Sequence, residues 1–160
     1  MSKRKLFAII ISVPILSASC IAYAQTNHVD PPGLVVTTPI QPQSAIVPSG
    51  ALHVPFTTVD LTARGTDIII DSITVVKSGA SDNEAFDDIL LLDSNGEVVS
   101  EGSLDDDNTV HFTDPIYIPR DTTLRLTVAT NMTEDLTDFD GQIASFTITN
   151  IAAHGYIPVH

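Results

Sequence analysis

The chain has 160 residues, in which seven Lys and Arg face 20 Asp and Glu, so the formal net charge is −13. A surface this acidic repels nucleic acid and anionic lipid headgroups, and we expect neither nucleic acid nor a membrane surface as a direct partner. The sequence holds one cysteine and no tryptophan, which excludes an intramolecular disulfide and disfavours an aromatic-walled sugar cleft.

Residues 1–24 have the layout of a secretory signal peptide. Three basic residues precede the apolar run 6–16, and an Ala-x-Ala motif ends at Ala24. We therefore expect a secreted protein, extracellular or at the cell surface, with the periplasm as a second possibility. A retained membrane helix is disfavoured by Pro14, and lipidation of Cys20 is disfavoured because Ser17-Ala18-Ser19 is a poor lipobox.

Residues 25–50 are rich in proline and predict an extended segment, because proline lacks the N–H that a central strand needs. One β-prone piece stands out within it, and it has two interpretations. It is either the first edge strand of its own domain or a strand donated to a neighbouring subunit by β-augmentation. Its residues are Gly33, Leu34, Val35, Val36, Thr37, Thr38, Pro39 and Ile40.

Residues 51–160 predict a single domain of short strands separated by turns. Alternating apolar and polar residues, or runs of β-branched residues, indicate strands at 56–63, 67–77, 109–113, 116–118, 122–130 and 142–151, with a hairpin at 86–100 and a last edge strand at 155–159. Asp71-Ser72 interrupts the second of these and predicts a bulge. No window predicts an amphipathic helix, so we expect an immunoglobulin-like antiparallel β-sandwich of seven to nine strands.

The stretch 86–100 predicts a β-hairpin. Leu90 and Leu92 share one face of its first strand and Ile89 and Leu91 the other, which indicates a strand with both faces buried inside a sheet. Asn95-Gly96 predicts a type I′ turn, because both central residues of that turn need a positive φ.

The succession VPFTTVDLTARGTDIIIDSITV, FDDILLLDSNGEVV and VHFTDPIYIPRDTTLRLTVATNM resembles the immunoglobulin-like modules of secreted bacterial surface proteins. The resemblance covers about residues 34–151 and rests on strand pattern. It implies an extracellular structural role.

Acidic loops offer candidate calcium ligands, because calcium takes six to eight oxygen ligands from carboxylates and carbonyls. The five candidates are Asp105, Asp107, Asp135, Asp138 and Asp140. The alternative is that these loops are solvated acidic turns. Residues 93–97 also echo part of a calcium loop, and a hairpin turn is the alternative there.

No nucleophile elbow or glycine-rich phosphate loop is present, and the five histidines show no metal-ligand spacing, so we expect no enzyme. The sequence predicts a structural protein that self-associates into a homopolymer, with residues 33–40 as the joint. The alternative is a calcium-stabilised adhesin or ligand-binding accessory module.

Overall fold

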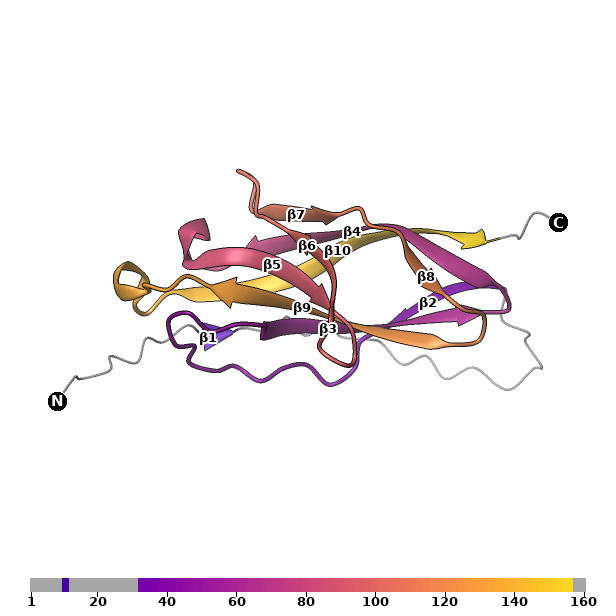
Figure 1. Cartoon of the computed structure of the whole chain (residues 1–160), viewed down its shortest axis with the longest axis horizontal. Helices are drawn as coiled ribbons and strands as arrows, with labels where there is room; N and C mark the ends of the chain where they lie inside the picture. Colours follow the sequence, from indigo (N-terminus) through magenta and orange to yellow (C-terminus); the bar gives the residue numbers. More distant parts are fainter. Residues whose placement is uncertain (1–9, 12–31, 157–160) are drawn as a thin grey trace, which may run out of the picture.

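The computed structural model describes residues 10–11 and 32–156, which form a β-sandwich (Figure 1). The prediction of an all-β sandwich of seven to nine strands is confirmed, since nine strands, β2 to β10, build its two sheets. Most of the predicted signal peptide, Cys20 included, lies outside the described residues. Within the described part, no helix has the length and apolar character needed to span a membrane.

The first sheet is built around β4 (Asp67–Ser78). On one side β4 pairs with β10 (Ile143–Tyr156), and on the other with β7 (Thr109–Phe112) and β8 (Ile116–Ile118) in succession. The two-residue strand β1 (Ile10–Ile11) pairs in parallel with the start of β10.

The second sheet has the order β2-β3-β9-β5-β6. Its strands are β2 (Gly33–Thr37), β3 (Val54–Arg64), β9 (Thr123–Met132), β5 (Phe86–Leu92) and β6 (Val98–Gly102), all paired antiparallel. Two 3₁₀ turns, η1 (Asn83–Ala85) and η2 (Thr137–Phe139), lie in the connections that lead into β5 and β10.

The core between the sheets contains three phenylalanines, contributed by β3, β5 and β10. Phe56 and Phe146 meet edge to face with ring centroids 4.8 Å apart, and Phe86 lies 5.4 Å from Phe146 and 6.2 Å from Phe56. All three side chains are buried. Because β10 belongs to one sheet and β3 and β5 to the other, this group holds the two layers together.

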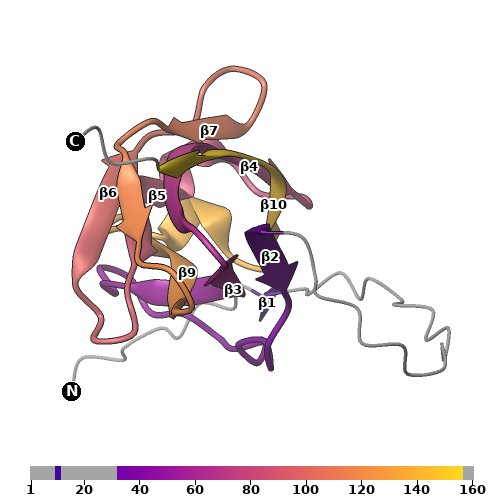
Figure 2. The same cartoon turned by 90° about the vertical axis from the view of Figure 1, so that its right-hand side faces the viewer.

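The two long sides of the sandwich differ. On one side β6 lies against β7, so closely that a Cβ on Gly102 would stand 2.7 Å from Val110 Cγ1. On the other side β10 faces β2 and β3 (Figure 2), and this side is open.

The predicted hairpin forms, but its turn is not type I′. Gly96 has a φ of +81° whereas Asn95 does not have a positive φ, and Gly96 N–H donates to Asp93 O at 3.1 Å. The carboxylate of Asp93 accepts the amides of Asn95 (2.8 Å) and Glu97 (2.9 Å), so it organises a longer turn. The register shift between Leu91 and Leu92 leaves an extra residue, Val99, in β6.

The predicted bulge in β4 is confirmed, because Ser72 and Ile70 face Ala152 and Ala153 and leave Asp71 without an opposite residue. The separate edge strand predicted at 155–159 is wrong. Gly155 and Tyr156 continue β10, which stays paired with β4 as far as Asp67. Residues 157–160 lie outside the described part.

Candidate functional site

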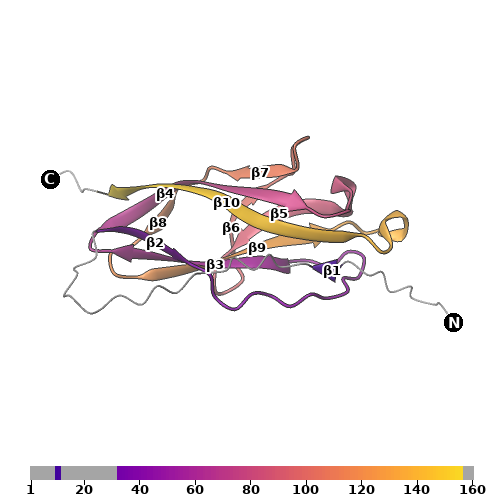
Figure 3. The same ribbon diagram turned by 180° about the vertical axis from the view of Figure 1, so that it is seen from behind.

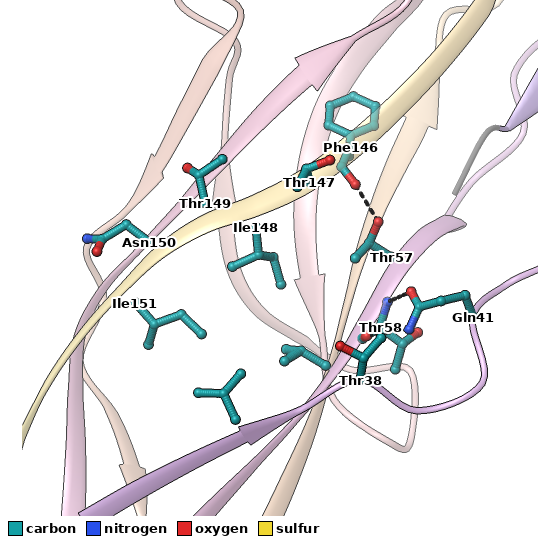
Figure 4. Close-up of a pocket in the computed structure, with 12 residues that line it drawn as sticks. Thr38, Gln41, Thr57, Thr58, Phe146, Thr147, Ile148, Thr149, Asn150 and Ile151 are labelled. Atoms are coloured by element: carbon teal, nitrogen blue, oxygen red, sulfur yellow. Dashed lines mark hydrogen bonds between the residues drawn. The ribbon is translucent and has the colours of Figure 1, made fainter. Parts of the chain in front are cut away.

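A cleft of about 470 Å³ opens along the side between β10 and the edge of the second sheet (Figure 4). One wall is formed by residues 146–151 of β10. The other is formed by residues 57–59 of β3 together with Val36, Thr38 and Gln41. Apolar side chains from both walls, such as Val59 and Ile148, alternate with threonines, and no residue that lines the cleft is charged.

The side chain of Gln41 occupies a place at the edge of β3 that a strand would otherwise take. Its Nε2 donates to Thr58 O (2.8 Å) and to Pro39 O (2.9 Å), and its Oε1 accepts Thr58 N–H (3.0 Å). β2 pairs with β3 only from Arg64 to Asp60, so Thr58 is two residues past the end of that ladder. The Gln41 amide therefore satisfies the edge backbone groups that β2 does not reach.

A hydrogen bond crosses the cleft from one wall to the other. The hydroxyl of Thr57 in β3 donates to the carbonyl of Phe146 in β10 (Figure 4). It ties the second sheet to the edge of β10 that faces away from β4. The cleft is thus a groove between two sheet edges, and its lining offers backbone groups, hydroxyls and apolar side chains but no ionisable group. Such a lining suits an extended peptide better than proton transfer.

In this single chain the β-prone segment 33–40 forms the edge strand of its own domain. Gly33–Thr37 pairs with β3, with Leu34 opposite Ala63, and Leu34 packs against the core. Val36 is 50% exposed and Ile40 is 97% exposed. Of its apolar side chains, therefore, only that of Leu34 joins the core, and β2 is held mainly by its backbone ladder.

The proline-rich connection from β2 to β3 runs along the domain surface. Val47 is buried, Ser49 Oγ accepts Leu136 N–H at 3.3 Å, and Gly50 N–H donates to Thr133 O at 2.8 Å. Residues 38–53 contain no regular secondary structure. They form a long connection that is attached to the domain at a few points.

Charged residues are unevenly distributed along the sequence, and the segments that form most of the cleft lack them. Residues 31–59 and 141–160 contain no Asp, Glu, Lys or Arg, whereas 19 of the 20 acidic residues lie between Asp60 and Asp140. At the boundary, Arg125 holds Asp60 with two hydrogen bonds of 2.7 and 2.8 Å. Its guanidinium lowers the pKa of Asp60 from the usual value.

The five calcium candidates are not brought into one group. Asp105 Oδ1 accepts the amides of Asp107 (3.0 Å) and Thr109 (2.7 Å), so it organises its own turn. The Asp135 carboxylate likewise accepts the hydroxyl and the amide of Thr137. These hydrogen bonds lower the pKa of Asp135, and the bond from the hydroxyl has the larger effect. Asp107, Asp138 and Asp140 are exposed. In the described residues no three His, Cys, Asp or Glu side chains are placed to hold a metal ion, and calcium binding stays a prediction.

The sequence predicts a role for the segment 33–40 but not for the residues that surround it in the fold. Gln41 and Thr57 were not singled out, and residues 146–151 were assigned to a strand without a role. One signal was available, namely the absence of charge from 31–59 and from 141–160. The pairing of Gln41 with Thr58 had no local signal, because it depends on how the chain returns after β2.

Comparisons of the chain with protein-family models, with curated proteins and with solved structures gave no match.

Proposed function

We propose that this protein is a non-catalytic structural subunit, exported from the cell, that self-associates into an extracellular filament or surface layer. Residues 33–40 act as the joint, by adding as a strand to the β3 edge of a neighbouring copy. The resemblance to immunoglobulin-like surface modules is in keeping with this role.

The observation that carries the proposal is the weak attachment of β2. It has five residues, one side chain against the core and a connection of 16 residues without regular structure, 38–53. A β2 strand donated to a neighbouring copy makes the same backbone hydrogen bonds with β3 and the same Leu34 contact as it makes within its own chain. Exchange therefore loses few contacts, and it is a low-cost route to oligomers. A head-to-tail exchange that does not close into a ring gives a filament.

A cysteine pair across β2 and β3 tests the exchange. Val35 and Thr62 are opposite one another in the ladder, and the only native cysteine, Cys20, can be replaced by serine. Directly opposite Cα atoms in an antiparallel pair are about 4.5–5.5 Å apart, which suits a disulfide. The variant is Val35→Cys with Thr62→Cys in a Cys20→Ser background, expressed in an exporting host.

If β2 is exchanged, oxidation after the protein has been concentrated gives a ladder of covalent multimers on a non-reducing gel. Oxidation in dilute solution gives monomers with an internal disulfide, which form no covalent multimers when they are concentrated afterwards. The single variants Val35→Cys and Thr62→Cys are the controls for random cross-linking. Monomers alone under both oxidation conditions would overturn the proposal.

A further inference from the structure

The edge of β10 that faces away from β4 is open over most of its length. Among the described residues, Ile10 and Ile11 pair with its start, opposite Ile143 and Ala144, and the Thr57 hydroxyl donates to Phe146 O. Ile10 and Ile11 lie in the stretch predicted to be removed on export. The inference that follows rests on the proposed export, and it concerns the part of the edge beyond Phe146. Seen from behind, β10 crosses the molecule from end to end with β2 below it (Figure 3).

This edge lacks the features by which proteins usually protect a sheet edge. Edge strands tend to be short, or to carry lysine, proline or an inward charge. β10 has 14 residues and contains none of these. Two register shifts interrupt its ladder with β4: one leaves Thr149 without an opposite residue in β4, and the other leaves Asp71 without an opposite residue in β10.

The charge distribution identifies the occupant. Two copies of an acidic chain repel one another wherever residues 60–140 meet, and β10 is the longest strand that carries no charge. Two carboxylates of β4 lie next to β10: Asp71, which is hydrogen-bonded to His154 Nδ1 at 2.8 Å, and Asp67, which is opposite Tyr156. The exposed rings of Tyr117 in β8 and Tyr156 at the end of β10 meet edge to face, 6.1 Å apart, across β4. They add side chains of an interface type to the face of the sheet at this end of β10.

From this geometry we infer that two copies of the chain pair edge to edge through β10, antiparallel and about a two-fold axis near residues 151–155. The two β10-β4-β7 sheets then join into one continuous sheet. This interface is separate from the exchange of residues 33–40, and it would link chains or filaments laterally. It uses the same surface on both copies, as a two-fold interface requires.

Cysteine scanning tests the pairing, because only a residue at the axis meets its own copy. In a Cys20→Ser background, single cysteines are placed in turn at Ile151, Ala152, Ala153, His154 and Gly155, with Val98→Cys on the opposite edge strand β6 as control. One or two neighbouring positions should form disulfide dimers efficiently upon mild oxidation. Equal cross-linking at all positions, or none above the control, overturns the inference.

A charge at the axis provides the second measurement. Ala153→Glu places two like charges together in the pair, and we expect the association measured by light scattering to weaken at least about tenfold. Val98→Glu, which adds the same charge on β6, should leave it unchanged. Equal weakening by both variants would assign the effect to net charge and reject the pairing. Neither variant changes Val35 or Thr62. The covalent multimers formed by β2 exchange can therefore be measured independently of pairing through β10.

Discussion

Replacing Gln41 by alanine tests the contact that holds the proline-rich connection to the domain. The Gln41 amide makes two hydrogen bonds with the backbone of Thr58, of 2.8 and 3.0 Å. A hydrogen bond of this kind contributes about 0.5–1.5 kcal/mol net, so Gln41→Ala should lower the free energy of unfolding by about 1–2 kcal/mol. The equilibrium constant for local opening of the connection should rise about tenfold, since about 1.4 kcal/mol corresponds to a tenfold change.

The assay is urea unfolding of Gln41→Ala beside Gln43→Ala, together with hydrogen exchange at the Thr58 amide. Gln43 is exposed and lies two residues further along the same segment, which makes it a matched control. Gln43→Ala should change stability by less than about 0.5 kcal/mol. If the two variants have the same unfolding midpoint, or if the Thr58 amide exchanges no faster in Gln41→Ala, the amide does not protect the edge of β3.

Four further outcomes are expected. Asp60→Asn should lower stability by less than about 1 kcal/mol, because Arg125 is half exposed. The pKa of Asp60 is lowered in the folded state, so its contribution is fully present above the unfolded pKa near 3.8 and is lost as the pH falls through the folded value. Melting temperatures of the two proteins should therefore begin to converge below about pH 4, and a difference that stays constant as the pH falls further would refute this. Phe146→Ala removes a buried ring with two aromatic partners, and urea unfolding should show a loss of about 3–5 kcal/mol; a loss below about 2 would mean that the sheets are joined elsewhere. Gly79→Ala should cost about 2 kcal/mol or more in the same assay, since Gly79 has a φ of +98° and its Cβ would collide with Ile143 O, and a neutral effect would contradict that geometry. Adding calcium on the order of 1 mM separates the two candidate roles: a structural subunit without a calcium site should change its melting temperature by less than about 2 °C, and a larger rise that chelator reverses would support the calcium alternative.

The strands could be predicted from the sequence because one face of each is buried and the residues alternate accordingly. Leu124, Leu126 and Val128 face the core from β9, as their spacing indicates, while Arg125 points outward to Asp60. The burial of both faces of β5 could also be predicted from the sequence. Leu91 lies in the main core, and Leu90 in a small cluster on the other face.

The features that the sequence did not predict depend on contacts between distant parts of the chain. Thr57 reaches Phe146 across 89 positions, and no local pattern encodes that bond. The turn at Asn95-Gly96 was misassigned because the Asp93 carboxylate, which organises it through two amides, competes with the type I′ geometry that the dipeptide favours. The cleft itself follows from the order of strands in two sheets, which a run of alternating residues does not specify.

The uneven distribution of charge has a kinetic consequence. Copies that approach one another in random orientations mostly present the acidic part of the chain, and this long-range repulsion acts over the Debye length, about 10 Å at 0.1 M salt. Encounters that lead to association through the uncharged side are therefore rare in dilute buffer. Added salt should accelerate assembly, the opposite of what is found for partners steered together by opposite charges. If the chain is exported and self-associates as proposed, its release into a medium of higher ionic strength would by itself speed assembly.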